Sequence, residues 1–232
     1  MKTVAIGDIH GRGIWRNIIE QEQPDMTVFI GDYFDTHDNI SVAQQMYNFN
    51  SILRYKKEHI DKAILLVGNH DYHYMRGIKE HYSGYQAIYA IDIQERLEYA
   101  LKNALLQLCY MQDGIIFVHA GFTKTWMNEV MGYEEFSISD INEMFENRPH
   151  KFGFRPGVNW SQYGDDITQS PIWVRPYSLM KDCLTGYRQV VGHTQVDKLD
   201  INNDIVLIDT LGTSEEYLVI NYGVMAVNSI VI

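Results

Sequence analysis

Cysteine is scarce in this chain of 232 residues, which contains only Cys109 and Cys183. The two lie far apart in largely apolar surroundings, and no C-x-x-C pair or zinc-ribbon spacing occurs. This argues against a thiolate metal site and a disulfide-stapled fold. We interpret both cysteines as free thiols in a reducing compartment, and we therefore expect a cytoplasmic protein.

Long apolar runs and an excess of basic residues are also missing. No run approaches the roughly 20 residues that a membrane-spanning helix needs, and we expect no cleavable signal before the strand that begins at Thr3. The chain has 19 Lys and Arg against 30 Asp and Glu, which gives a formal net charge of −11. Such a chain repels a phosphate backbone, so we expect neither a membrane nor a nucleic-acid partner.

The residues that are present alternate between strand and helix patterns. Short apolar strands are expected at Thr3–Ile6, Met26–Ile30 and Ala63–Val67, with helices at Ile14–Gln23 and Ala43–His59 between them. Asp38 and Ser41 are the candidate caps of the second helix. This rhythm predicts a parallel sheet with right-handed crossovers, in the α/β class. Because 46% of the residues are hydrophobic and no linker or repeat interrupts them, we expect a single domain over residues 1–232.

The second half of the chain is less regular. We expect a helix over Gln86–Gln112, and strands at Ile115–Val118 and Arg188–Val191 with short helices at Thr123–Met131 and Ser139–Phe145 between them. An antiparallel meander is expected from three further strands, Asp204–Asp209, Glu216–Asn221 and Val224–Ile232. Segment 150–164 has high aromatic content and no period, so we expect it to fold over another part of the protein.

Five of the expected strands end in the same kind of motif, in which a glycine stands beside Asp, Asn or His. In parallel sheets, functional side chains gather beyond the carboxyl ends of the strands, so we expect the five motifs to meet. The motifs are Gly7-Asp8-Ile9-His10-Gly11, Gly31-Asp32-Tyr33-Phe34-Asp35, Gly68-Asn69-His70-Asp71, His119-Ala120-Gly121 and Gly192-His193-Thr194.

The side chains of these motifs suit hard and borderline divalent cations. Carboxylates, imidazoles and an amide without thiolates are ligands for Mn, Fe, Zn or Mg. A carboxylate can bridge two such cations, which lie about 3.5–4 Å apart in two-metal sites. A single motif of this kind is more often a turn, a helix cap or a hydrogen-bonded histidine. Five in one chain are hard to obtain as independent turns, so we predict a metal site.

In this order, the five motifs resemble the signature of the calcineurin-like metallophosphoesterases. Within that superfamily, Gly7 to Gly11, Val118 to Gly121, Ile172 to Arg175 and Gly192 to Thr194 are most similar to the phosphoprotein phosphatase branch. That branch includes bacterial and phage protein phosphatases and symmetrical diadenosine tetraphosphate hydrolases. The resemblance implies a β-sandwich flanked by helices, with the active site at the carboxyl ends of the strands.

The resemblance also implies roles for individual residues. Two divalent cations would bind, most simply manganese, with iron, zinc, nickel or magnesium as alternatives. A hydroxide bridging them would attack phosphorus, while His70 protonates the leaving oxygen and Asp35 orients His70. Arg175 would clamp the phosphoryl group. The implied ligands are Asp8 and His10 for the first cation, Asp32 as the bridge, and Asn69, His119 and His193 for the second.

The chain departs from that branch after Asp35, where Thr36-His37 replaces an Arg-Gly pair. The phosphate-binding arginine of the motif is therefore missing, and Arg12, Arg155 or His37 are candidates to replace it. We expect His37, His73 and His81 at the rim of the site. Other expected roles are support of a ligand histidine by Asp71 and support of the site by Asp209. Trp160 is a candidate for contact with a substrate base or peptide, with packing as a plug of its loop as the alternative.

The substrate is left open by these patterns. A phosphorylated protein and a small nucleotide such as diadenosine tetraphosphate both fit the resemblance. A protein that kept the fold without the chemistry is a further alternative, although such proteins typically lose a metal ligand or the general acid. Here all of these residues are present.

Overall fold

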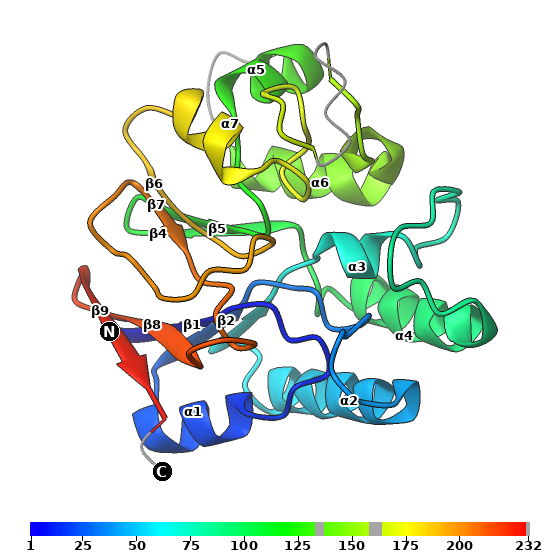
Figure 1. Cartoon of the computed structure of the whole chain (residues 1–232), viewed down its shortest axis with the longest axis vertical. Helices are drawn as coiled ribbons and strands as arrows, with labels where there is room; N and C mark the ends of the chain where they lie inside the picture. The colour runs from blue at the N-terminus through cyan, green and yellow to red at the C-terminus, as the bar shows by residue number, and fades with distance from the viewer. Residues whose placement is uncertain (133–136, 158–163, 231–232) are drawn as a thin grey trace.

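Two β-sheets form the centre of the molecule (Figure 1). The structure, a computed structural model, describes residues 1–132, 137–157 and 164–230. The first sheet has the order β3-β2-β1-β8-β9 and the second the order β4-β5-β6-β7. The strands are β1 (Lys2–Ile6), β2 (Met26–Phe29), β3 (Ala63–Leu65), β4 (Cys109–Gln112), β5 (Ile115–Val118), β6 (Arg188–Val191), β7 (Ile205–Leu207), β8 (Glu216–Asn221) and β9 (Val224–Ser229).

The two sheets pack face to face. Alternate residues of β1 point to opposite sides, so Ala5 joins Phe117 and Val190 of the second sheet in one buried cluster. Val4 and Ile6 belong instead to a larger cluster with side chains of the helices. A shift of one residue in the register of β1 would exchange the two faces, so both clusters fix its pairing. The expected β-sandwich flanked by helices is confirmed.

Helices cover the outer faces of both sheets. In Figure 1, α1 (Trp15–Glu22) and α2 (Val42–Glu58) lie along the first sheet, and α5 (Lys124–Trp126), α6 (Ile138–Asn147) and α7 (Pro176–Lys181) gather beyond the second. Ser41 begins α2 with the expected cap, since its hydroxyl accepts from the Gln44 N–H while the Gln44 side chain accepts from the Ser41 N–H. The remaining elements are α3 (Asn69–Tyr72), η1 (Ala87–Tyr89), α4 (Ala90–Lys102), η2 (Met127–Met131) and η3 (Pro149–Phe152).

The long helix expected over Gln86–Gln112 is wrong in its second half. Helix α4 ends at Lys102, and Ala104 adopts a left-handed φ of 52° while the Leu105 N–H bonds back to the Ala100 carbonyl. This is a helix-ending turn of the Schellman kind. The apolar spacing continues past it because the leucines that follow are buried, and the chain then forms β4 against β5.

The expected antiparallel meander is only partly correct. Strand β7 pairs in parallel with β6 in the second sheet, whereas β8 and β9 form an antiparallel hairpin beside β1 in the first. The three strands therefore exist, but they divide between two sheets. The division places Asp209, just after β7, at the same end of the sheets as the five motifs.

Segment 150–164 is described except for residues 158–163. Phe152 is fully buried, with its ring 5.3 Å from that of Trp126, and the Phe154 ring lies 5.3 Å from that of Trp173. This part of the segment therefore packs into the core, as expected. Trp160 and Tyr163 lie outside the described residues. Across the described ranges, no helix combines the length and apolarity needed to cross a membrane.

Candidate functional site

The ends of the parallel strands meet at one cavity of about 400 Å³. Asp8 follows β1, Asp32 follows β2, Asn69 follows β3, and His193 follows β6. His119, after β5, is fully buried beneath them, with its Nε2 atom 2.9 Å from Asn69 Oδ1. The cavity is lined by Asp8, His10, Arg12, Asp32, His37, Asp38, Asn69, His70, Tyr82, Ser83, Trp173, Arg175, His193, Gln195, Asp209 and Gly212.

Four candidate site residues have left-handed backbone. The φ angles are 42° at His10, 50° at Asp32, 62° at Asp35 and 64° at His193. A residue with a side chain is uncommon in this region, and such residues cluster at functional sites. All four stand in the loops that follow β1, β2 and β6, where the chain turns.

The glycines of the motifs make room for carboxylates. A side chain on Gly68 would overlap Oδ1 of Asp32, and one on Gly192 would overlap Oδ1 of Asp8. Both glycines therefore let a carboxylate approach the backbone of a neighbouring motif closely. The Asp8 carboxylate uses this space to accept the backbone N–H of His193, at 2.9 Å from Oδ2.

Three of the histidines each have one ring nitrogen within hydrogen-bond distance of a backbone carbonyl. His10 Nδ1 lies 2.7 Å from the Phe34 oxygen, His119 Nδ1 3.1 Å from the Ile30 oxygen, and His193 Nε2 3.1 Å from the Trp173 oxygen. Carbonyls accept only, so these nitrogens carry the proton. The other nitrogen of each ring then presents a lone pair to the site, as ligand histidines do.

The groups that face one another in the site are mostly acceptors. His119 Nε2 and His193 Nδ1 lie 2.9 and 2.8 Å from Asn69 Oδ1, and His119 Nε2 lies 3.3 Å from Asp32 Oδ2. With the ring protons directed at carbonyls, these contacts place lone pairs against lone pairs. A divalent cation would resolve them, since it accepts from all of these atoms.

The charges point to the same conclusion. Burial, with the carboxylates of Asp209 and Asp32 close by, raises the pKa of Asp8 well above its usual value. Burial and Asp32 likewise raise the pKa of Asp209 to about 6. Burial lowers the pKa of His10 to about 4, which keeps this ring neutral. Buried carboxylates beside neutral imidazoles lack compensating positive charge, and bound cations would supply it.

Asp71 supports the backbone rather than a ligand histidine, so its expected role needs correction. Its carboxylate accepts the backbone N–H groups of Gly68, Asp32 and Tyr33 at 2.8–2.9 Å. It thereby joins the second and third motifs and holds Asp32 in its left-handed turn. Asp32 Oδ1 in turn accepts the His70 N–H at 2.8 Å, which leaves Oδ2 directed toward His10 and His119.

His70 and Asp35 form the expected pair. His70 Nδ1 lies 3.2 Å from Asp35 Oδ2, and the His70 ring lines the cavity. Burial alone would lower the pKa of His70, but the carboxylates of Asp32 and Asp35 outweigh it and raise the pKa. Asp35 is buried, which would raise its pKa, but hydrogen bonds from His70, His73 and Tyr74 lower it.

His73 is not at the rim of the site, contrary to the sequence-based expectation. It is buried, and its Nε2 atom lies 2.6 Å from Asp35 Oδ2. The Tyr74 hydroxyl donates to the other oxygen of the same carboxylate. Helix α3 explains the placement, because His70 and His73 are three residues apart and face the same side. That spacing was visible in the sequence; the burial of His73 was not.

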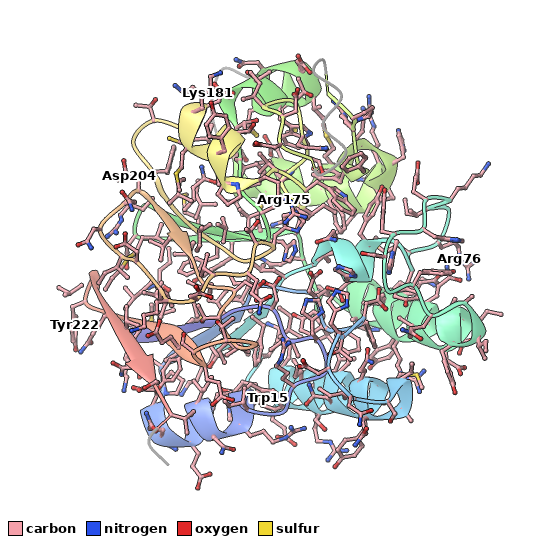
Figure 2. The ribbon with its side chains drawn as sticks, viewed as in Figure 1. Trp15, Arg76, Arg175, Lys181, Asp204 and Tyr222 are labelled. Carbon is pink, nitrogen blue, oxygen red and sulfur yellow. The ribbon has the colours of Figure 1, made fainter. Side chains whose placement is uncertain are left out.

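Arg175 reaches the cavity from the start of α7, near the middle of the molecule (Figure 2). Its Nη1 donates to the His193 carbonyl at 3.0 Å and to Thr194 Oγ1 at 3.1 Å. Arg12 lines the same cavity, with Nε 2.8 Å from Asp38 Oδ2. His37 is an exposed lining residue. Arg155 lies outside the cavity lining, with its N–H bonded to Gln169, so Arg12 and His37 remain as replacements for the missing arginine.

Several wall residues carry no signal in the sequence. Tyr82 and Ser83 come from the loop after α3, and Gln195 and Gly212 from turns after β6 and β7. Their positions depend on loop paths that no periodicity predicts. Among the described residues, two groups of three could hold a metal ion, since the ligand atoms within each group lie within 4.8 Å of one another. They are Asp8, Asp32 and His119, and Asp35, His70 and His73.

Known proteins of similar structure include phosphatases. A mutant of a cold-active protein tyrosine phosphatase matches with a TM-score of 0.64 and 16% identity, over 99% of this chain and 80% of that one. A Saccharomyces cerevisiae protein serine/threonine phosphatase with similarity to human phosphatase PP5 gives 0.57 and 12%, over 100% and 81%. A protein provisionally described as a diadenosine tetraphosphatase gives 0.52 and 15%, over 98% and 92%. At these identities the likeness concerns the fold alone.

The sequence itself matches a family. A comparison with curated protein sequences finds no match. A sequence model of the calcineurin-like phosphoesterases, however, matches residues 1–208 of the 232-residue chain, a span that includes all five motifs. Members of this family are dinuclear metal-dependent enzymes, and the donor set at the strand ends fits such a centre. The chain therefore belongs to the calcineurin-like phosphoesterase family and is a metal-dependent hydrolase.

Proposed function

We propose that this protein hydrolyses phosphomonoesters, in the manner of a serine/threonine protein phosphatase. The observation that carries the proposal is the convergence of three kinds of group on one cavity. Acceptors for cations, the ring of His70 with Asp35 behind it, and Arg175 all meet at the same space of about 400 Å³. Metal-assisted phosphoryl transfer needs each of these, for charge neutralisation, proton donation and positioning.

In this proposal, two cations divide the strand-end donors between them. Asp8 and His10 would hold the first cation, Asn69, His119 and His193 would hold the second, and Asp32 would be a ligand of both. When bound, the cations lower the pKa of a coordinated water and neutralise phosphoryl oxygens. Manganese suits this mixture of carboxylate, imidazole and amide ligands.

The remaining groups act on the substrate directly. His70 donates its proton to the leaving oxygen as the P–O bond breaks, and the electron pair of that bond stays on the oxygen. Asp35 keeps the His70 ring in place and stabilises its charged form. Arg175 and Arg12 both line the cavity and bind phosphoryl oxygens, with Arg12 compensating for the arginine missing after Asp35.

A second candidate substrate is a dinucleoside polyphosphate such as diadenosine tetraphosphate. A neighbouring cavity of about 420 Å³ shares Arg12, Asp38 and Gly212 with the site, and Ile14, Ile40 and Leu211 add apolar surface to its lining. A group attached to the phosphate has room there, and either a peptide or a nucleoside meets that description. A panel of phosphopeptides, diadenosine tetraphosphate and simple nucleotides, tested with the manganese-loaded protein, separates the two candidates.

Replacement of the proposed acid tests the reaction itself. With manganese bound, His70→Asn should lower kcat for an alkyl phosphate by roughly 10²–10⁴-fold, because the leaving alkoxide loses its proton donor. Metal content should stay at the wild-type level, as measured by elemental analysis. His81→Asn is the matched control, since this histidine is exposed, stacks on Tyr85 and lies outside the lining of the cavity, not at its rim as expected. Full activity of His70→Asn would remove this residue from the mechanism.

A further inference from the structure

Asp35 lies between two histidines rather than beside one. His73 Nε2 is 2.6 Å from Asp35 Oδ2, closer than the 3.2 Å that separates His70 Nδ1 from the same oxygen. The His73 side chain is fully buried, whereas 14% of the His70 side chain is exposed to the cavity. Asp35, His70 and His73 either hold a cation or form a chain of hydrogen bonds. Which ring nitrogen of His73 carries the proton decides between the two.

A contact from the loop after α3 determines which ring nitrogen of His73 carries the proton. The backbone N–H of Tyr82 donates to His73 Nδ1 at 3.2 Å. Nδ1 must therefore carry a lone pair, and the ring proton lies on Nε2, directed at Asp35. A protonated Nε2 has no lone pair for a metal ion. The hydrogen bonds thus favour a chain from Tyr82 through His73 and Asp35 to His70, and not a third cation.

The other oxygen of Asp35 is fixed as well. The Tyr74 hydroxyl donates to Oδ1, and it is free to do so because it accepts the Gln86 N–H at 2.7 Å. Aromatic neighbours hold the His73 ring, with the ring of Tyr74 at 4.5 Å and that of Tyr85 at 5.1 Å. The Asp35 carboxylate, which also contacts His70, is therefore held at both oxygens, by His73 at Oδ2 and by Tyr74 at Oδ1.

We propose that His73 is a positioning residue for the general acid: through Asp35 it holds the His70 ring in the orientation that protonates the leaving oxygen. This inference rests on the function proposed above. Tyr82 also lines the cavity, and its backbone N–H donates to His73. The cavity wall is therefore linked directly to the hydrogen bonds that position the acid. The contribution of His73 to kcat/KM should then be larger for substrates whose leaving oxygen needs a proton more.

Two esters with different leaving groups test this. p-Nitrophenolate is stable as an anion, whereas an alkoxide is not. In His73→Leu, kcat/KM for an alkyl phosphate should fall by about 10–100-fold, the usual range for loss of a supporting hydrogen bond at a metal site, while p-nitrophenyl phosphate is much less affected. His73→Gln can place an amide N–H near the position of Nε2 and should recover most of the lost activity. Metal content and thermal unfolding are measured for each variant.

Tyrosines on either side of His73 supply a matched pair of variants should His73→Leu fail to fold. Tyr74→Phe removes a donor to Asp35, and Tyr72→Phe removes a hydroxyl that donates instead to the Pro149 carbonyl. Tyr74→Phe should lower kcat/KM for the alkyl phosphate more than for p-nitrophenyl phosphate. Tyr72→Phe should show no such difference between the two esters. A readout without turnover is the ¹⁵N NMR spectrum of the metal-free protein, in which His73 should carry its proton on Nε2.

The outcomes are distinguishable. Equal losses on both esters, a His73→Gln variant no better than His73→Leu, or a proton on Nδ1 of His73 would overturn the inference while leaving the proposed function intact. A wild-type protein that hydrolyses neither ester would overturn the proposed function, and this inference with it.

Discussion

Gly192 has no side chain, and the carboxylate of Asp8 fills the space that one would need. Gly68 stands in the same relation to Asp32. The identity of these residues is therefore set by a neighbour that is distant in sequence. The site therefore needs residues without side chains at these two positions, because each carboxylate must reach both a backbone N–H and the place where a cation would bind.

Gly192→Ala is expected to weaken metal binding. The added methyl group would displace Asp8, and a displaced ligand of this kind should cost about 10–100-fold in affinity for Mn²⁺. Calorimetric titration of the metal-free protein measures the change. Gly13→Ala is the control, since its methyl group would meet only the movable end of Arg16. Equal affinity in the Gly192 variant and the wild type would show that Asp8 does not bind the metal from its present position.

At the scale of elements, one carboxylate ties helix α1 to the first sheet. Glu22, near the end of α1, accepts from Lys2 Nζ of β1 at 2.5 Å, from the Tyr217 hydroxyl of β8 at 2.7 Å, and from the Asn228 amide of β9 at 2.8 Å. Burial would raise its pKa, but these hydrogen bonds prevail and lower it to about 2. The hairpin and the helix are thereby held against the strand that carries Asp8.

The stabilisation from Glu22 should depend on pH. Its pKa is lowered in the folded protein, so its contribution is complete above the ordinary value of 4.5 and is lost as the pH falls toward 2. Glu22→Gln should therefore cost about 2 kcal/mol in the free energy of unfolding at pH 7. The difference from wild type should shrink across that acid window. Urea unfolding at several pH values measures it, and a difference independent of pH would contradict the assignment.

At the scale of the whole molecule, the metal site concentrates repulsion. The chain has a formal net charge of −11, and Asp8, Asp32 and Asp209 are buried within one site. Such a cluster opposes folding until cations neutralise it. The pairing of the two sheets brings these carboxylates together, since Asp209 arrives from β7 of the second sheet and the other two from the first.

Metal removal should therefore destabilise the wild type. Saturating Mn²⁺ at about 100 times its Kd adds about 2.7 kcal/mol per site, and a chelator should remove this and lower Tm. Asp8→Asn should behave in the opposite way without metal. It relieves repulsion and keeps an oxygen for the His193 N–H, so it should be at least as stable as metal-free wild type but gain little from Mn²⁺. Thermal unfolding with and without chelator checks both expectations, and equal stabilisation of the variant by Mn²⁺ would contradict them.

Local sequence patterns are enough to locate the strand ends. Asp8, Asp32, Asn69, His119 and His193 each follow a short apolar run, and parallel strands place such residues at one edge of their own sheet. Three of them follow strands of the first sheet and the two histidines follow strands of the second, so their meeting also needs the packing of the sheets. The same local logic predicted the Ser41 cap of α2. It failed where apolar spacing fits two structures, as it does beyond Lys102, because buried leucines look alike in a helix and in an extended segment.

The surroundings of those strand ends depend on contacts between distant segments. The burial of His73 against Asp35 depends on a loop that folds back over α3, and the choice of Arg12 over Arg155 depends on which arginine reaches the cavity. Neither follows from spacing, since the partners are joined by contacts between segments rather than by a period. Strand ends are fixed by the backbone geometry of the sheet, whereas the second layer of the site is fixed by side chains that meet only after both sheets have packed.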